Sequence, residues 1–479
     1  MNQRFILLFL FLPLFPIFVA YVFSNFVFVY EEPDFDSLLM ESYKNMHPRW
    51  WAFGQSESEE PRQWHQPATV QEIVAIVSEA AERGERVKVV GAGHSFSPIG
   101  LTTGRIMNLD RLRLVLDVDE ISMQVTVQAG IRLRDLNRQL GTRGLALENI
   151  GSIDAQSLGG AISTSTHGSG IGFSSMSTKV VWMELVLANG SLLNVSKETE
   201  ELFAASLNGL GLLGIITTVR LQCVKDYNVI RRDILVGIDH VIDSWSEYVE
   251  KYDHFTYFWI PYTESAKLFL MTRTDTSVSV NKSDLLFFKD YGGVTAGKML
   301  MLGWWSGSVI PSVLPWITRY YIQPLLGLDL NYVDNARDGL KLESPASYSE
   351  MEYFVSLENY TRCFRDLKHL IETSDEFRVN FVVQTRFSAA DSVWLSPMYR
   401  EPKAAIAVMT IRQDDRAYFN KAELIFKQYG GRTHWGKRFT ANGDYFRKVY
   451  ERFDDFLAVR KELDPSGMFL NEYFQRIFL

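Results

Sequence analysis

Apolar residues in the first half of the chain change their spacing several times, and each change predicts a new element. Thr69 and Glu72 have the spacing of a helix capping box, and apolar residues follow at helical spacing until Gly84. Residues 87–90 then form a short apolar run, which is typical of a buried strand. The small-residue sequence GAGHSFS follows this strand at once.

The pattern continues to mix strands and helices up to about residue 225. Residues 125–129 alternate between apolar and polar side chains as a strand does, and residues 131–141 have helical spacing. Residues 182–188 and 191–195 flank an Asn-Gly pair, which is a strong β-hairpin signal. We therefore assign this part of the chain to the α+β class.

Beyond residue 225 aromatic side chains are dense and glycine-rich loops are rare. Residues 299–328 combine several Trp and Tyr residues with three prolines. The prolines argue against a second membrane-spanning helix. Two interpretations stay open for this stretch: a buried helical cap, or a patch at a membrane interface, where Trp and Tyr collect.

Residues 5–23 form an apolar run close to the length that spans a bilayer as a helix. The run is longer than the apolar region of a cleaved signal peptide and lacks a clear small-residue cleavage site. Arg4 precedes it and four acidic residues follow it, so we expect residues 1–33 to form a single-pass anchor with a cytosolic N-terminus. The catalytic body would then lie in the lumen, most simply that of the endoplasmic reticulum. Three N-x-S/T sequons agree with this orientation: Asn194, Asn281 and Asn359.

Size and charge narrow the class of protein. A chain of 479 residues normally divides into two or more domains. The formal net charge of −8 and the lack of a Lys/Arg-rich block argue against a nucleic-acid partner. Only two cysteines are present, Cys223 and Cys363, so neither a disulfide scaffold nor a CxxC pair exists and no metal site is expected. Two free buried thiols are favoured over one disulfide between them.

Two glycine-rich stretches are candidates for holding a dinucleotide. Residues 209–214 (GLGLLG) match the GxGxxG pattern, but a helix is expected before them and a strand after them, which is the reverse of a Rossmann unit. Close packing of a helix on a strand explains them better than a classical NAD site. Residues 91–97, in contrast, follow a strand, and their glycines allow backbone N–H groups to face an anion. Residues 157–170 add a dense run of small and hydroxyl side chains that suits a backbone wrapped around a planar, phosphate-bearing cofactor, although a flexible loop would have the same composition.

Taken together these stretches resemble the vanillyl-alcohol-oxidase-type FAD-binding proteins. Within that group the chain is similar to the aldonolactone oxidases, the L-gulonolactone and D-arabinono-1,4-lactone oxidases. The matching segments are 87–97, 125–153, 157–170, 211–224, 430–439 (GGRTHWGKRF) and 463–474. The resemblance implies a two-subdomain FAD-binding domain over residues 34–225 and an α+β substrate or cap domain over residues 226–479. The C-terminal segment, from about residue 430, would return to the flavin site.

The resemblance also implies how FAD is held. His94 stands where the family attaches the flavin covalently through its 8α-methyl group, and the alternative is a hydrogen bond to a non-covalent FAD. The pyrophosphate would be held by Gly91, Ala92, Gly93, Ser95 and Ser97. The isoalloxazine or ribityl chain would contact Ser163, Thr164, Thr166, His167 and Gly168. Ile216 would contact the adenine side, and Gly151 and Ser152 would lie at the flavin. Related dehydrogenases that avoid oxygen have alanine at the place of Gly151, so glycine there predicts reaction with O2.

The substrate residues implied by the resemblance lie late in the chain. His434 and Lys437 belong to the HWxK motif, and Arg386 would share with Lys437 the task of stabilising the reduced flavin. Gln384 departs from the family, which has Glu-x-Arg where this chain has Gln-Thr-Arg. An amide can hydrogen-bond a substrate hydroxyl but cannot take up its proton.

The resemblance therefore predicts FAD-dependent oxidation of a sugar 1,4-lactone (L-gulono-, L-galactono- or D-arabinono-1,4-lactone). Hydride would pass to flavin N5, O2 would be the acceptor and H2O2 the product, in the biosynthesis of ascorbate or an analogue. Three alternatives stay open: a membrane-anchored reductase of the sterol-reductase type, an alditol oxidase, and a flavin-binding scaffold without activity.

Overall fold

The computed structural model describes most of the chain after residue 57. The described residues are 50–51, 58–279, 303–304, 310–327, 329–342, 348–411 and 416–479. The anchor expected at residues 1–33 and the sequon at Asn281 lie outside them. Among the helices that are described, none is both long enough and apolar enough to cross a membrane.

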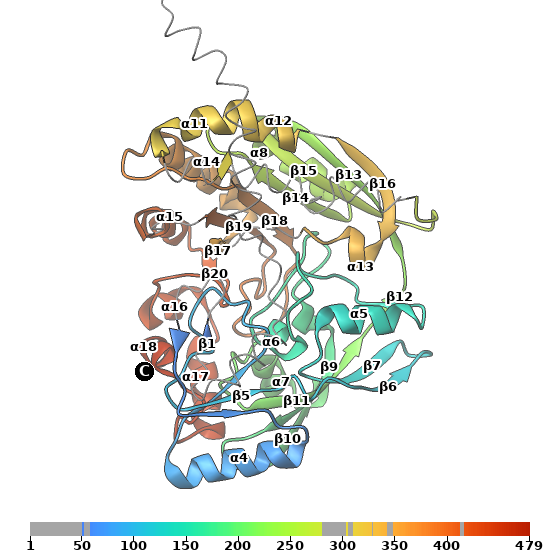
Figure 1. Cartoon of the computed structure of the whole chain (residues 1–479), viewed down its shortest axis with the longest axis vertical. Coiled ribbons are helices and arrows are strands. Elements are labelled where there is room, and N and C mark those ends of the chain that lie inside the picture. The colour runs from blue at the N-terminus through green and yellow to red at the C-terminus, as the bar shows by residue number, and fades with distance from the viewer. Residues whose placement is uncertain are drawn as a thin grey trace, which may run out of the picture.

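The first sheet after residue 60 is parallel and has the strand order β3 (Gln63–His65), β5 (Arg105–Asn108), β4 (Val87–Val90). Helix α4 (Val70–Arg83) connects β3 to β4 and lies at the bottom of the molecule in Figure 1. The backbone N–H of Glu72 donates to the Thr69 hydroxyl over 3.1 Å, and Gly84 ends the helix with a φ of +61°. The predicted helix and the predicted strand are both confirmed.

The second sheet has five antiparallel strands and contains the predicted hairpin. Its order is β10 (Leu192–Ser196), β9 (Val180–Val186), β11 (Ile215–Gln222), β7 (Gln124–Gln128), β6 (Val115–Asp119). Helix α5 (Leu133–Gly141) follows β7, and its buried leucines pack with β7 and β11 in one core. Short elements complete this part: β1 (Trp50–Trp51), β2 (Ser58–Glu59), β8 (Leu145–Ala146), α6 (Leu158–Ser163), α7 (Glu200–Ser206) and β12 (Val224–Lys225). The mixture of helix and sheet confirms the α+β class.

The third sheet has eight antiparallel strands and occupies the upper half of Figure 1. Its order is β16 (Leu330–Asn335), β13 (Asn228–Gly237), β15 (Ser265–Thr274), β14 (His254–Trp259), β18 (Val383–Ser388), β19 (Lys403–Thr410), β17 (Ser349–Ser356), β20 (Arg432–Thr433). Helices α8 (Ile238–Lys251), α14 (Leu357–Thr373) and α15 (Arg416–Gln428) pack on one face through one aromatic-rich core. Because side chains alternate along a strand, Glu350 and Glu352 of β17 and Gln384 and Arg386 of β18 point to the opposite face.

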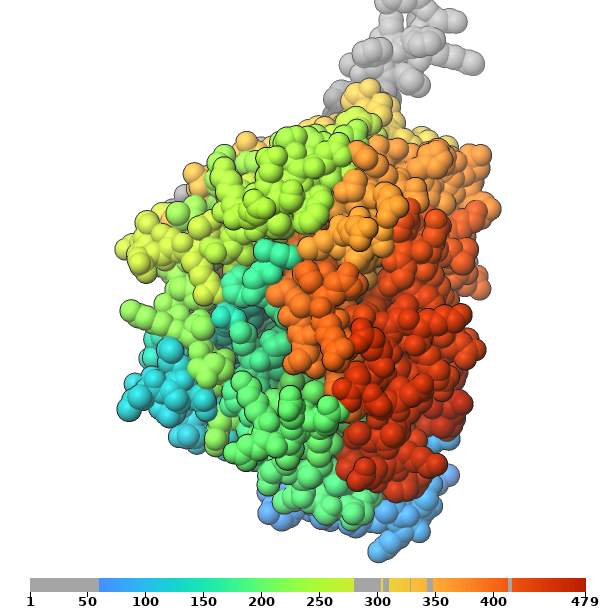
Figure 2. Space-filling view, turned by 180° about the vertical axis from the view of Figure 1, so that it is seen from behind, coloured from blue at the N-terminus to red at the C-terminus, as the bar shows by residue number. Residues whose placement is uncertain are grey.

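The C-terminal helices return to the first half of the chain. They are α16 (Gly443–Val449), α17 (Phe453–Leu463) and α18 (Glu472–Phe478). The Val87 N–H donates to Met468 O over 3.0 Å, and Asn471 Nδ2 donates to Leu101 O over 2.8 Å. From behind, the red C-terminal residues lie directly against the green residues near 200, in agreement with the contacts between α17 and α7 (Figure 2). The last fifty residues therefore belong to the surroundings of the 91–97 loop.

The described part of the aromatic stretch is helical: α11 (Leu314–Ile317), a π-helical turn (Thr318–Ile322) and α12 (Gln323–Leu326). Trp304 is buried, whereas Trp316 and Tyr320 are 56% and 61% exposed. The stretch thus covers the sheet on one side and presents aromatic side chains on the other. Both cysteines are free and buried, as expected.

Candidate functional site

An open cleft lies between the first two sheets. Its walls are formed by residues 88–95, 109–110, 129–130, 156–164 and 210–216, with further residues between 97 and 101. The cleft brings together many of the residues proposed for FAD: Gly91, Ala92, Gly93, His94, Ser95, Ser97, Ser163, Thr164 and Ile216. The backbone dominates the wall at the 91–95 loop, as the binding of a phosphate-bearing group requires.

The close approach of two loops explains why residue 91 is glycine. A Cβ on Gly91 would lie 1.8 Å from Ser157 Oγ, the side chain of the N-cap residue of α6. Ser163 and Thr164, at the other end of α6, donate their hydroxyls to the Gly159 and Gly160 carbonyls over 2.7 and 3.0 Å. The floor of the cleft is therefore a short helix packed against the 91–95 loop without space for side chains between them.

His94 is half-buried in the cleft wall and lies in a positive field. Burial, together with the charges of Arg132, Lys437 and Arg134, lowers the pKa of His94 to about 4. The imidazole is therefore neutral at neutral pH and keeps a nitrogen lone pair.

The GLGLLG segment contributes to this cleft, although its context is that of close packing. Helix α7 precedes it and β11 follows it, as predicted, so it is not a Rossmann fingerprint. Leu210, Gly211 and Gly214 nevertheless line the cleft. The spacing of apolar residues predicted the helix before GLGLLG and the strand after it correctly. It could not show that the turn between them lines the cleft.

Lys88 is a cleft residue that sequence reasoning missed. Its side chain is buried, and Nζ donates to Leu210 O over 3.5 Å and to Phe469 O over 3.1 Å. Burial lowers its pKa to about 7, although Asp464 acts in the opposite direction. Lys88 thereby joins the GLGLLG turn to the C-terminal segment. A lysine inside an otherwise apolar strand was the available signal.

Five proposed cofactor residues do not line the cleft: Gly151, Ser152, Thr166, His167 and Gly168. A Cβ on Gly168 would lie 2.3 Å from Ile150 O, so this glycine is required by packing. The Ser152 carbonyl accepts from Leu342 N over 3.0 Å, and Thr166 Oγ1 accepts from Gln156 Nε2 over 3.3 Å. His167 is buried and points at the third sheet.

A second group of polar side chains covers the face of the third sheet that points away from α8 and α14. Strand register places Gln384 of β18 beside Ala407 of β19, and Ala407 beside Glu352 of β17. Arg386 lies in the same way beside Ala405. The alanine methyl groups leave space across β19, and the Arg386 guanidinium donates through it to Glu352 Oε1. The buried ion pair of Arg386 and Glu352 therefore bridges β18 and β17 across β19.

The HWGK loop connects this sheet face to the 91–97 loop. Phe96 N–H donates to Gly436 O over 2.8 Å, and Ser97 Oγ donates to Trp435 O over 3.0 Å. On the sheet side His434 N–H donates to Glu352 O over 3.0 Å, and Lys437 forms an ion pair with Glu350. The loop therefore holds His434 and Lys437 between the cleft and the sheet.

Trp435 anchors this loop. The indole is completely buried, stacks on Tyr450 with ring centroids 5.6 Å apart, and donates from Nε1 to Leu395 O over 2.8 Å. Lys437 leaves the loop on the other side, with Nζ 4.8 Å above the Phe96 ring. Trp435 therefore holds the loop in place, and His434 and Lys437 supply its polar groups.

The buried groups on the sheet face differ in charge. Burial opposes ionisation of Glu352, but the Arg386 guanidinium holds its pKa well below the ordinary value. Burial raises the pKa of Glu350, although Lys437 opposes this effect. Burial lowers the pKa of His167, and that of His434 falls well below its ordinary value. The site combines an ionised carboxylate with two neutral imidazoles.

Gln384 lies next to this ion pair. It is 6% exposed, and its Nε2 has no hydrogen-bond partner within the described residues. The carboxylate that the resemblance led us to expect at position 384 is absent, but Glu352 supplies one to Arg386 from two strands away. Sequence reasoning missed Glu350 and Glu352. Acids at alternate positions of the strand sequence EMEYFV were the signal that could have found them.

Comparisons with known proteins agree with this arrangement. Residues 219–477 match the D-arabinono-1,4-lactone oxidase family and residues 61–196 match the FAD binding domain family. The chain is 32% identical to L-gulonolactone oxidase of Scyliorhinus torazame over 426 residues, which cover 88% of this chain and 96% of that protein. It is 34% identical to L-gulono-1,4-lactone dehydrogenase of Mycobacterium tuberculosis over 412 residues, 86% of this chain and 94% of that one. A crystal structure of cholesterol oxidase from Brevibacterium sterolicum matches with a TM-score of 0.73 at 14% identity, covering 90% of this chain and 97% of that chain, and shows the shared fold.

These matches identify FAD as the cofactor, and the cleft fits it. The cleft is long and open, with a glycine-backbone wall and a loop contact at Gly91 that a side chain would fill. A cationic side chain, Lys437, lies near one end, and small residues of the GLGLLG turn line the wall with Ile216. Residues 91–95 and 157–164 would hold the cofactor along its length.

We predict that Gly91→Ala reduces the flavin content of the purified protein, because the methyl group forces the 91–95 loop away from α6. Overpacking of this kind costs about 1–3 kcal/mol. The measurement is flavin absorbance per protein. Gly172→Ala is the matched control, since no atom lies within 4 Å of the added methyl group.

A second change should restore binding in the same loop. Ser157 makes no side-chain capping bond, so Ser157→Gly removes the obstructing atoms without removing a cap. The double variant Gly91→Ala/Ser157→Gly is expected to regain most of the flavin. A flavin content as low as that of Gly91→Ala would show that the close approach is not the reason for glycine.

Proposed function

We propose that this chain, which belongs to the D-arabinono-1,4-lactone oxidase family, oxidises a hydroxyl group of a sugar 1,4-lactone with O2 as the final acceptor and H2O2 as the product. L-gulono-, L-galactono- and D-arabinono-1,4-lactone are the substrates we infer, and the product would be ascorbate or an analogue. The observation that carries the proposal is the HWGK loop. It places His434, Lys437 and the Arg386–Glu352 pair beside the 91–97 loop of the FAD cleft.

The residues of this site have separate tasks in the proposed reaction. Bound FAD supplies a two-electron acceptor. Lys437 is a cation close enough to His94 to lower its pKa, and a cation there stabilises negative charge on the reduced cofactor. Gln384 Nε2 is a buried donor that a substrate oxygen would satisfy. Trp435 and the backbone bonds of Phe96 and Gly436 keep these groups in place before the substrate arrives.

Anaerobic reduction of the purified protein tests the proposed substrate class. We expect at least one of the three lactones to bleach the oxidised flavin spectrum under nitrogen, and air to restore it with release of H2O2. Bleaching by NADPH but by no lactone would favour a reductase of the sterol-reductase type. Bleaching by alditols alone would favour an alditol oxidase, and bleaching by none of these would favour an inactive scaffold.

We further propose that His94 carries the flavin covalently. The ring is neutral at neutral pH because its pKa is lowered to about 4, and the neutral imidazole is the form that can attack the flavin methyl group. After acid denaturation, flavin fluorescence should remain on the polypeptide. His94→Ala is expected to leave the flavin in the supernatant. A wild-type supernatant that contains all the flavin would contradict the covalent bond.

Gly151 is proposed to keep the flavin accessible to oxygen. An alanine methyl group there would lie 3.2 Å from Thr166 Cγ2 and 3.6 Å from His167 O, so it would fill the space between these two segments. Gly151→Ala should slow reoxidation by O2 about tenfold or more, which corresponds to about 1.4 kcal/mol in the barrier, and slow reduction by lactone much less. Stopped-flow measurement of the two half-reactions separates the effects. Equal slowing of both would argue that Gly151 only shapes the site.

We also propose that residues 1–33 anchor the chain in the membrane of the endoplasmic reticulum with the catalytic body in the lumen. Their apolar run and flanking charges support this orientation, and the exposed Trp316 and Tyr320 would suit a lipid interface. The full chain should stay with membranes during an alkaline carbonate wash, and deletion of residues 1–33 should release it. Release of the full chain by the same wash would refute the anchor.

A further inference from the structure

Backbone groups fix the imidazoles of His167 and His434 in opposite tautomers. The Gly168 carbonyl, which can only accept, lies 3.0 Å from His167 Nδ1, so Nδ1–H is the tautomer that satisfies it, and in the neutral ring Nε2 then keeps the lone pair. The Gly436 N–H, which can only donate, points at His434 Nδ1 over 3.0 Å, so the proton of the neutral ring is on Nε2. The same residue type therefore offers a proton acceptor at one position and a donor at the other.

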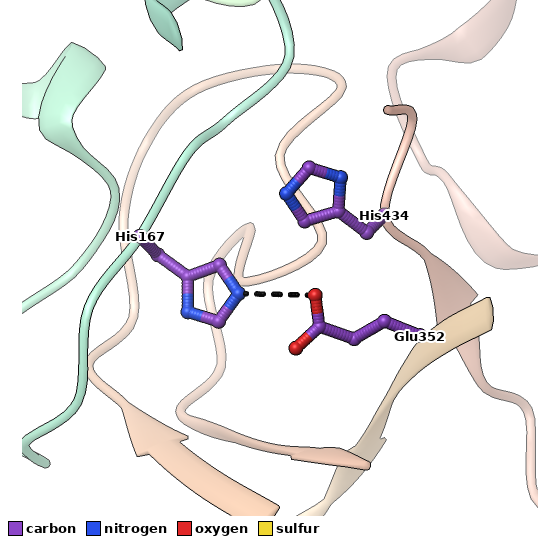
Figure 3. A group of neighbouring side chains, drawn as sticks. All are labelled: His167, Glu352 and His434. Atoms are coloured by element: carbon purple, nitrogen blue, oxygen red, sulfur yellow. Dashed lines mark ion pairs between the residues drawn. The ribbon is translucent and has the colours of Figure 1, made fainter. Parts of the chain in front are cut away.

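The lone pair of His167 meets a second acceptor. Its Nε2 lies 3.5 Å from Glu352 Oε2, as the dashed line in Figure 3 shows. Both atoms are buried and lack a hydrogen-bond donor in the described part of the chain. Two acceptors that face each other without a proton between them are poorly satisfied. A proton placed between them would satisfy both acceptors.

The surroundings keep that proton off the pair until a substrate provides one. Arg386 donates to the other carboxylate oxygen of Glu352 and also to the His167 carbonyl. The remaining groups that face the pair are the His434 imidazole, the Ser388 hydroxyl 3.5 Å from His167 Nδ1, and the Glu350–Lys437 ion pair beyond them. With Arg386 in place, both members of the pair are unprotonated at neutral pH.

A metal ion is the competing occupant, because the ligand atoms of His167, Glu352 and His434 lie within 4.8 Å of one another. The tautomers argue against this occupant: His434 would have to give up either its Nε2 proton or its bond from Gly436. The guanidinium of Arg386 on the same carboxylate adds repulsion against a cation. A substrate hydroxyl that loses its proton needs an acceptor for the proton and a donor to its oxygen. His167 Nε2 and Glu352 Oε2 supply the acceptor, and His434 Nε2–H supplies the donor.

We propose that His167 and Glu352 act as one base that takes up the proton of the oxidised substrate hydroxyl, while His434 Nε2–H donates a hydrogen bond to the same oxygen. This inference rests on the proposed lactone oxidation. In that step the carbon of the H–C–O–H group loses its hydrogen with two electrons to FAD, which is reduced. The oxygen loses its proton to the space between His167 Nε2 and Glu352 Oε2. A C=O double bond forms in place of the C–H and O–H bonds, and the proton leaves the pair when the enzyme is reoxidised.

The inference explains how the chain can work with glutamine at position 384. An amide accepts no proton. The carboxylate on Arg386 comes from Glu352 instead, which lies two strands away from Gln384 on the same sheet face. Gln384 keeps the task of orienting the substrate.

The tautomers themselves can be measured, without turnover, in the flavin-loaded protein. The chain has eight histidines, and ¹⁵N-histidine labelling distinguishes Nδ1–H from Nε2–H rings. His167→Gln and His434→Gln assign the two signals. We expect Nδ1–H for His167 and Nε2–H for His434 at neutral pH. The same tautomer at both positions, or a charged ring at either, would overturn the proposal.

The kinetic test is the anaerobic half-reaction with the lactone that bleaches the flavin. Glu352→Gln keeps an acceptor for Arg386 but places an amide against His167, and we expect flavin reduction to slow by about 10²–10⁴-fold. In the wild-type enzyme the rate should fall below pH 6.5 as the pair becomes protonated, since the pKa of His167 is lowered from that value. In Glu352→Gln and His167→Gln this acid limb should disappear. A limb that survives in both variants would overturn the proposal.

His254→Gln is the matched control. His254 is buried in the same sheet, and its Nδ1 also lies near a backbone carbonyl, Ser169 O, at 2.8 Å, but its ring stacks on Phe173 and does not contact Glu352. This variant should keep both the rate and the acid limb. If Glu352→Gln does not fold, His167→Gln is the variant to test. Its flavin content and melting temperature must equal those of the wild type for the loss of the acid limb to count. If no lactone or alditol bleaches the wild-type flavin, the proposed function fails, while the tautomers still decide whether the base exists.

Discussion

Arg386 introduces a positive charge into a sheet face where its neighbour on β19 is an alanine, and the rest of the site is arranged around that charge. Its guanidinium reaches Glu352 across the alanine strand and donates to the His167 carbonyl at the same time. Removing one partner of a buried ion pair costs about 3–5 kcal/mol, because the other charge is left without compensation. Larger side chains at Ala405 or Ala407 would separate the two charges without changing either one. The small residues of β19 are therefore as necessary to the site as the charged ones.

This ion pair also explains how two separately folded sheets share one site. The His167 segment follows α6, whose residues line the FAD cleft, whereas Arg386 and Glu352 belong to the eight-stranded sheet. The HWGK loop makes the second connection, since its backbone bonds both to Glu352 and to Phe96. The first connection joins the Arg386 side chain to the His167 carbonyl, and the second uses backbone hydrogen bonds on both sides. Cofactor and substrate groups can then keep one geometry although they come from distant parts of the chain.

The sequence allowed local features to be predicted and left the long-range ones hidden. Thr69, Gly84 and the Asn-Gly hairpin follow from capping and turn chemistry that acts over a few residues. The 91–97 loop was found because a strand, two glycines and a histidine stand next to one another. Glu352 could not be assigned to Arg386, because that contact depends on the register of β17 against β19 and of β19 against β18, and helix α14 separates β17 from the other two strands in sequence. Gln384 signalled a missing carboxylate, but only the sheet showed where another one is.

The three histidines of the site show how the same side chain acquires different chemistry from its surroundings. Burial keeps all three rings neutral, and positive neighbours contribute to the same effect. Their difference arises from single backbone atoms: a carbonyl at His167 Nδ1 and an N–H at His434 Nδ1. His94 differs again because it lies in the cleft wall, where the cations that keep its ring neutral would also stabilise negative charge on a bound flavin. In the proposed complex the same positive field would keep the His94 ring neutral and favour the reduced cofactor.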